Sequence, residues 1–308
     1  MNYNIIDIDQ DTRLIKISDY YYDKLVSSGA LETEQSNILL YIAVSHHCAN
    51  KPLHIIDLVK EQYPRVTVAI LANTREEQQY YQARTNNPVI YCNNNAFVNY
   101  NLFKPTEGRV LKYDMLINSR FCRYKHNYLG RLCNGGNGGK GVAHIGYFSD
   151  KEEYVFPKFG TYLNFGGRDL TPENYQFISP QDVVGHINSS MCVGIFSNVE
   201  GACRASSEAL LCGVPVISTK SRGGRDVWYT RHNSVVCDSS VGSVRRALEE
   251  VRRRFARGEF NATKIREDHM NESKQHVNRL FDHIESVLGR AINREALEVQ
   301  LLHADMCI

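Results

Sequence analysis

Two glutamates bracket a run of small residues in the stretch EGACRASSEALLCGVPVIS, residues 200 to 218. Glu200 and Glu208 are separated by seven residues, and Arg204 lies between them. The helix predicted here opens on small residues: Gly201, Ala202 and Ala205. Free backbone N–H groups at such a helix start can approach a phosphate closely. A carboxylate beside a phosphate is unfavourable unless it binds hydroxyls, so the pattern predicts a ligand with both phosphates and sugar hydroxyls.

A second pair of charged residues lies in NSRFCRYKHNYL, residues 118 to 129. Arg120 and Lys125 follow a predicted strand and precede a predicted helix. Two cations at such a place could clamp a diphosphate and stabilise charge that develops on a leaving group. The plainer interpretation makes the cations and the two glutamates solvated surface charges. The occurrence of both pairs in one chain favours a binding site.

Alternating strands and helices must position these side chains. The first unit is predicted to contain strands at 38–44, 65–73 and 88–92 and helices at 53–62 and 75–84. The second is predicted to contain strands at 111–121, 191–197, 214–219 and 234–238 and helices at 125–133, 180–190, 241–256 and 272–288. This alternation predicts parallel sheets. Ligands then bind at the carboxyl ends of the strands, where helix N-termini receive anions.

The elements divide the chain into three predicted parts. An N-terminal Rossmann-like lobe covers 1–108, a C-terminal lobe that carries both charged motifs covers 109–288, and a helical tail at 289–308 could pack back on the first lobe. The Asn-rich segment NNNAFVNYNLFKPTEGRV, which lacks periodicity, is interpreted as the linker between the lobes.

The ordered motifs resemble those of the retaining GT-B glycosyltransferases of the glycosyl transferases group 1 type. Arg120 and Lys125 match that family's Arg and Lys five positions apart, and Glu200 and Glu208 match its two glutamates ahead of a Cys-Gly-x-Pro-Val strand. The double glycine of SRGGRDVW, Gly223-Gly224, matches another motif, and the linker is similar too. The resemblance covers roughly residues 88 to 255. The family's Gly-rich loop near the N-terminus is not recognisable here.

The resemblance implies a fold, an activity and residue roles. The fold would be two Rossmann-like lobes facing a cleft, with a reduced N-terminal lobe. Arg120 and Lys125 would bind the donor diphosphate, Glu200 the hydroxyls of the transferred sugar, and Glu208 the ribose. Residues expected to line the donor site further are Gly201, Ala202, Cys203, Arg204, Gly223 and Gly224. The donor would be a UDP-sugar, with no bound cofactor or metal, and transfer would retain anomeric configuration by front-face attack.

Other motifs carry weaker predictions. His46 and His47 follow a strand end and are candidates for the acceptor side, whereas a metal site with Cys48 is disfavoured because adjacent residues rarely point to one ion. The glycine-rich segment at 134–141 does not fit a phosphate-binding P-loop, because Lys140 is followed by glycine. It is predicted to be a loop near the cleft. The Arg-rich helix at 241–256 is interpreted as a solvated face, with contact to anionic lipid or nucleic acid as the alternative.

Composition sets broad limits on the protein class. The chain has 308 residues, a net charge of +2 and nine cysteines without a CxxC pair, which favours reduced thiols over a disulfide framework. No apolar run reaches the roughly 18 residues of a membrane span, and the N-terminus does not resemble a signal peptide. We therefore expect a cytoplasmic protein, in the host cytoplasm if it is viral.

Three functions remain open at this stage. The first is a transferase that builds a surface glycan or glycolipid precursor. The second is a viral-type glycosyltransferase that modifies DNA, which the short first lobe and the arginines would permit. The third is a non-catalytic protein that binds sugar nucleotides, against which the intact charged motifs argue.

Overall fold

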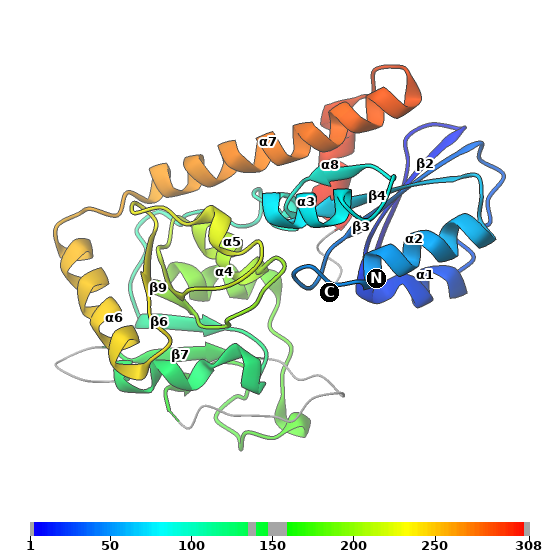
Figure 1. The fold of residues 1–308 in the computed structure, drawn as a ribbon. Helices are drawn as coiled ribbons and strands as arrows, with labels where there is room; N and C mark the ends of the chain where they lie inside the picture. Colours follow the sequence, from blue (N-terminus) through cyan, green and yellow to red (C-terminus); the bar gives the residue numbers. More distant parts are fainter. Residues whose placement is uncertain (1–2, 135–139, 147–158, 305–308) are drawn as a thin grey trace.

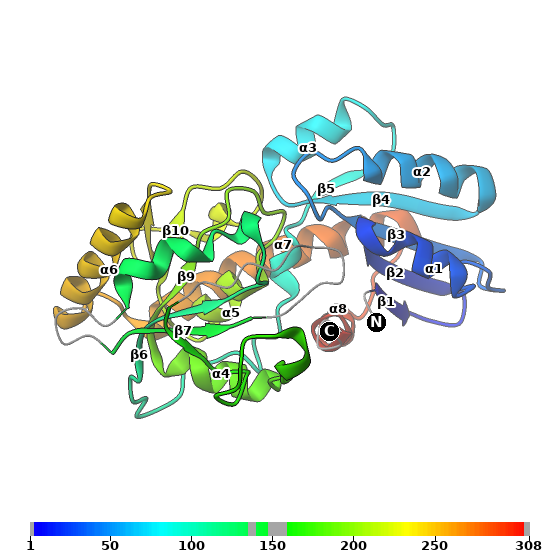
Figure 2. The ribbon, with the colours of Figure 1, turned by 90° about the horizontal axis from the view of Figure 1, so that it is seen from below.

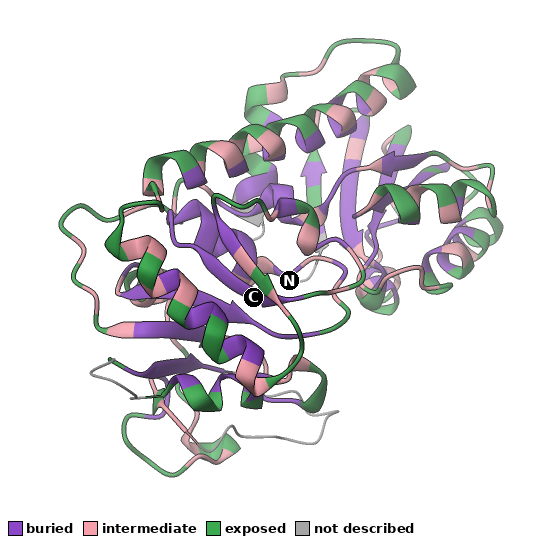
Figure 3. Ribbon diagram, turned by 60° about the vertical axis from the view of Figure 1, so that its left-hand side comes forward, coloured by how far each residue is buried: buried purple, intermediate pink, exposed green. Residues whose placement is uncertain are grey.

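The computed structural model describes residues 3–134, 140–146 and 159–304, which form two α/β lobes (Figure 1). Each lobe contains a sheet whose neighbouring strands are mostly parallel. The predicted class, two Rossmann-like lobes, is confirmed. Buried strands lie between helices whose outer faces are exposed (Figure 3).

The N-terminal lobe is built on a five-stranded sheet in the order β1-β2-β3-β4-β5. Its strands are β1 (Tyr3–Asp7), β2 (Thr12–Ser18), β3 (Asn37–Ala43), β4 (Val66–Ala72) and β5 (Val89–Tyr91). Its helices are η1 (Asp19–Tyr21), α1 (Tyr22–Ser27), α2 (Lys51–Gln62), α3 (Arg75–Gln82) and η2 (Asn94–Phe97), where η marks a 3₁₀ helix. β1 pairs antiparallel with β2, and the other pairs are parallel. β3 is buried on both faces, as expected of a central parallel strand.

The C-terminal lobe is built on a six-stranded parallel sheet in the order β11-β10-β9-β6-β7-β8. Its strands are β6 (Tyr113–Asn118), β7 (Val142–Ile145), β8 (Thr161–Tyr162), β9 (Ser190–Ile195), β10 (Val216–Thr219) and β11 (Ser234–Cys237). Its helices are η3 (Arg123–Lys125), η4 (Asn127–Cys133), η5 (Pro172–Asn174), α4 (Pro180–Asn188), α5 (Arg204–Leu211), η6 (Asp226–Trp228) and α6 (Val241–Ala256).

Helix α7 (Ala262–Leu288) runs past both lobes, and α8 (Arg294–Ala304) lies beside β1 and β2 (Figures 1 and 2). On α8, Leu297 and Leu301 are buried in the same apolar core as Ile6 of β1. That core also contains Leu116 and Val193 from the other sheet, so the two lobes share apolar packing. No helix among the described residues is long and apolar enough to cross a membrane.

The local structure differs from the predictions in several places. Asn93 and Asn95, in the segment predicted as the linker, are buried and hydrogen-bond to the C-terminal lobe. The helix predicted at 125–133 is two 3₁₀ helices, interrupted at His126, whose φ is +49°. Strands β1 and β2 lacked a recognised sequence signal.

Candidate functional site

The charged motifs meet where the central strands of the C-terminal sheet end. β6 and β9 are parallel neighbours. Arg120 and Lys125 follow β6, and Glu200 follows β9. Carboxyl ends of parallel strands lie at one edge of a sheet, which is where open α/β sheets bind ligands.

Lys125 and Glu200, 75 residues apart in the sequence, form a direct ion pair between Lys125 Nζ and Glu200 Oε1. The exposed fractions of the two side chains are 13% and 12%. Ser197 Oγ donates a second hydrogen bond to Glu200 Oε1 at 2.6 Å. The structure therefore brings together two residues predicted separately, in a largely dehydrated setting where charge interactions are strong.

Glu208 lies on the buried side of α5, with two polar neighbours. Asn118 Nδ2, at the end of β6, donates to Glu208 Oε2 at 3.4 Å. Arg204 Nε lies 3.8 Å from Glu208 Oε1, one helical turn away. Burial raises the pKa of Glu208, and the Arg204 charge offsets part of that rise. A buried carboxylate beside the strand ends is not the solvated helix position of the plainer interpretation.

Gly201 is small because the N-terminal lobe packs directly against it. A Cβ added at Gly201 would lie 2.5 Å from the carbonyl oxygen of Ser45, in the loop after β3. Helix α5 begins at Arg204, after Ala202, and its N-cap residue Cys203 accepts a hydrogen bond from Asn95 Nδ2 at 3.0 Å. Gly201 thus serves contact between the lobes, a reason for its small size that the sequence pattern did not indicate.

Close packing also explains the double glycine, Gly223-Gly224. Gly223 has φ +107°, which disfavours other residues, and an added Cβ would collide with the Glu200 carbonyl. Gly224 N donates to Gly201 O at 2.7 Å. Its carbonyl accepts from Asn93 Nδ2 at 2.8 Å. These glycines hold the backbone around Glu200 against the first lobe.

Arg225 is a residue whose importance the sequence did not reveal. Its side chain is fully buried. Its Nη1 donates to Ser197 O at 2.8 Å and to Ser197 Oγ at 3.1 Å, and Nη2 donates to Thr219 O. Arg225 thereby ties the ends of β9 and β10 and orients the serine that hydrogen-bonds to Glu200. An arginine after a double glycine was a visible signal, but its burial was not.

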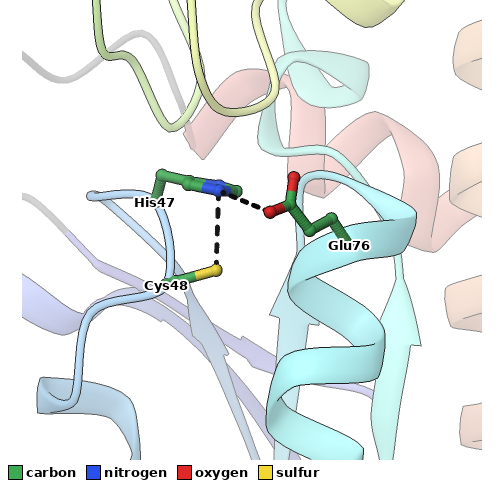
Figure 4. A group of neighbouring side chains, drawn as sticks. All are labelled: His47, Cys48 and Glu76. Carbon is green, nitrogen blue, oxygen red and sulfur yellow. Dashed lines mark hydrogen bonds and ion pairs between the residues drawn. The ribbon is translucent and has the colours of Figure 1, made fainter.

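The predicted acceptor-side histidines lie in the loop after β3. His46 Nδ1 is 3.3 Å from Ser45 Oγ. His47 lies between Cys48 and Glu76 at the start of α3 (Figure 4), and its Nδ1 also contacts Glu77. Most of the glycine-rich segment at 134–141 lies outside the described residues.

No protein-family model and no curated protein matches the sequence. Solved structures match the fold at low identity. TarM from S. aureus, a mutant bound to fondaparinux, α-GlcNAc-glycerol and UDP, aligns with TM-score 0.60 and 11% identity over 87% of this chain. This chain covers 54% of TarM, or about half its length.

This chain covers a larger share of two further solved structures. HepE from Anabaena, in complex with UDP, aligns with TM-score 0.58 and 16% identity over 87% of this chain and 82% of HepE. Sucrose-phosphate synthase from Thermosynechococcus elongatus aligns with TM-score 0.58 and 10% identity, over 87% and 78% of the two chains. These likenesses define the fold as that of the GT-B glycosyltransferases.

Proposed function

We propose that this protein is a glycosyltransferase that moves a sugar from a UDP-sugar to a glycan or glycolipid precursor. The observation that carries the proposal is the Lys125–Glu200 ion pair at the carboxyl ends of β6 and β9. The GT-B fold and the UDP bound in TarM and HepE support it.

Each charged residue has a role that its position supports. Arg120 and Lys125 bind the donor diphosphate and stabilise the charge of the departing UDP. A phosphate that reaches Lys125 competes with Glu200 for its ammonium, which leaves the Glu200 carboxylate to accept hydrogen bonds from sugar hydroxyls. Glu208, near the middle of α5, accepts hydrogen bonds from the ribose hydroxyls.

The backbone N–H groups of residues 201–204 contribute to phosphate binding at the start of α5. Protein cations neutralise the diphosphate without a bridging divalent ion. The sugar is transferred with retention by front-face attack, the donor phosphate acting as base, so no protein nucleophile is needed. The loop that carries His46 and His47 faces the acceptor.

The test is donor hydrolysis by the Glu200→Gln variant. The variant keeps the shape and the Ser197 contact but loses the charge, so we expect UDP release from UDP-sugars to fall about 100-fold or more, while UDP binding measured by calorimetry persists. Glu249→Gln, a change on the exposed face of α6, should match wild type. Full hydrolysis by Glu200→Gln would refute the proposed role.

Further measurements on the reaction test its stereochemistry and its dependence on metal ions. NMR of the product should show a retained anomer, and the rate should not depend on added Mg²⁺ or Mn²⁺. A DNA acceptor would instead require duplex binding that weakens steeply with salt. Such binding would replace the glycan acceptor with DNA and leave the donor side unchanged.

A further inference from the structure

Three side chains of the N-terminal lobe that could bind a metal ion lie close together (Figure 4). His47 Nε2 lies 3.5 Å from Cys48 Sγ and 3.5 Å from Glu76 Oε1. The three ligand atoms all lie within 4.8 Å of one another. Two ligand atoms of a tetrahedral Zn²⁺ ion lie about 3.3–3.6 Å apart, given bonds of about 2.0 Å to nitrogen or oxygen and about 2.3 Å to sulfur.

Backbone conformation explains how adjacent residues can reach one ion. Cys48 has φ +51°, in the left-handed region that non-glycine residues seldom adopt. The turn is closed by a hydrogen bond from Ala49 N to His46 O at 3.2 Å. This turn brings Cys48 Sγ to the same side as the His47 ring, which removes the objection that neighbours in the sequence point apart.

The buried carboxylate of Glu77 orients the His47 ring through its Nδ1 atom. The Glu77 side chain is 0% exposed, and its Oε1 lies 3.2 Å from His47 Nδ1. Its Oε2 accepts from Asn73 N at 2.6 Å. A proton on Nδ1 that is donated to Glu77 leaves the Nε2 lone pair directed at Cys48 and Glu76. Metal-bound histidines are commonly held in this way by a carboxylate.

We propose that His47 Nε2, Cys48 Sγ and Glu76 bind one Zn²⁺ ion, with water in the fourth position. The mixed sulfur, nitrogen and oxygen donor set suits zinc better than Mg²⁺ or Ca²⁺. Binding displaces the Cys48 thiol proton to solvent. The inference rests on the N-terminal lobe alone and does not depend on the proposed transferase activity.

The ion would connect the loop after β3 to the start of α3. The same loop contacts Gly201 through the Ser45 carbonyl. Zinc would therefore fix the surface that the N-terminal lobe presents to the start of α5. Its role is to position this loop, and it is separate from the cations that hold the donor diphosphate.

The test titrates ZnCl₂ and CoCl₂ into the untagged full chain after metal removal. We expect one equivalent of Zn²⁺ to bind and to raise the melting temperature. Co²⁺ should give the near-ultraviolet thiolate-to-cobalt absorption band. Cys48→Ser should lose that band, whereas Cys237→Ser, which removes another partly exposed thiol, should keep it.

Glu77→Gln tests the orienting carboxylate. Its oxygen would stay on Asn73 N and its amide would donate to His47 Nδ1, which forces the His47 proton onto Nε2. We expect zinc affinity to fall about 10- to 100-fold. The wild-type Co²⁺ spectrum remains decisive if a variant misfolds. Absence of the band in wild type, or its survival in folded Cys48→Ser, would overturn the proposal.

Discussion

At the scale of single residues, burial determines the chemistry of the two glutamates. Glu200 is paired with Lys125, so its charge is compensated inside the protein. Glu208 has longer polar contacts, at 3.4 Å to Asn118 Nδ2 and 3.8 Å to Arg204 Nε. Its raised pKa records that imbalance. A ligand hydroxyl that donates to Glu208 would relieve it.

We predict that Glu208→Gln makes the ligand-free protein more stable at neutral pH. Burial places the folded pKa above the ordinary value of 4.5, so the folded state binds more protons than the unfolded state between these two values. Wild-type stability attributable to this group therefore falls as pH rises from about 4.5 to the folded pKa, by about 1.4 kcal/mol for each pH unit between the two pKa values.

The measurement is the free energy of unfolding of wild type and Glu208→Gln against pH by urea denaturation. The difference should grow from pH 4.5 upward in favour of the variant and then level off, while UDP-sugar affinity falls. A constant difference across this range would contradict the assignment.

At the scale of elements, glycines set how closely the loop after β10 approaches the first lobe. A Cβ built on Gly224 would lie 2.3 Å from Asn73 Cβ, 2.4 Å from Gly201 O and 2.6 Å from Asn93 Nδ2. Loops at strand ends are therefore packed into an interface between lobes. Their conformation is decided by contacts with the segments that follow β4 and β5 and that precede α5.

Gly224→Ala should destabilise the protein by about 1–3 kcal/mol, the usual cost of overpacking, and should also lower donor turnover because Glu200 shifts with its neighbours. Gly185→Ala is the control, because that helical glycine of α4 has open space around it and should gain about 0.5–1 kcal/mol. Thermal melting of both variants checks this. Equal stability of the two variants would contradict the packing explanation.

At the scale of the whole molecule, α7 joins parts that lie far apart in the sequence. Arg266 Nη1 donates to Leu211 O at 2.8 Å, at the end of α5. Its Nη2 donates to Tyr100 O at 2.6 Å, after η2. Further along, His283 Nδ1 lies 2.9 Å from Tyr41 OH on β3. One helix thus contacts both lobes and the segment between them.

We predict that Arg266→Met lowers the free energy of unfolding by about 2–3 kcal/mol, since carbonyls lose a charged donor. It should also separate unfolding of the two lobes, visible as non-coincident transitions by fluorescence of Trp228 in the C-terminal lobe and by circular dichroism. Arg253→Met on the exposed face of α6 is the matched control. Two coincident transitions in Arg266→Met would argue against the coupling.

The sequence by itself determined many of the central elements and the order of the charged motifs. Apolar runs predict β3, β4 and β9 within two residues of their ends, and Gly213 follows α5 in the left-handed conformation typical of a glycine at a helix end, with φ +68°. Such signals are local, because apolar periodicity and glycine conformation depend on a few neighbouring residues.

Only the tertiary structure decided which residues meet. The Lys125–Glu200 pair, the burial of Arg225 and the contact of Gly201 with Ser45 each join residues from different elements. The His47–Cys48–Glu76 cluster also needs a left-handed turn at Cys48 and the approach of α3. No local pattern encodes such contacts, since they depend on how β-strands and helices pack across two lobes.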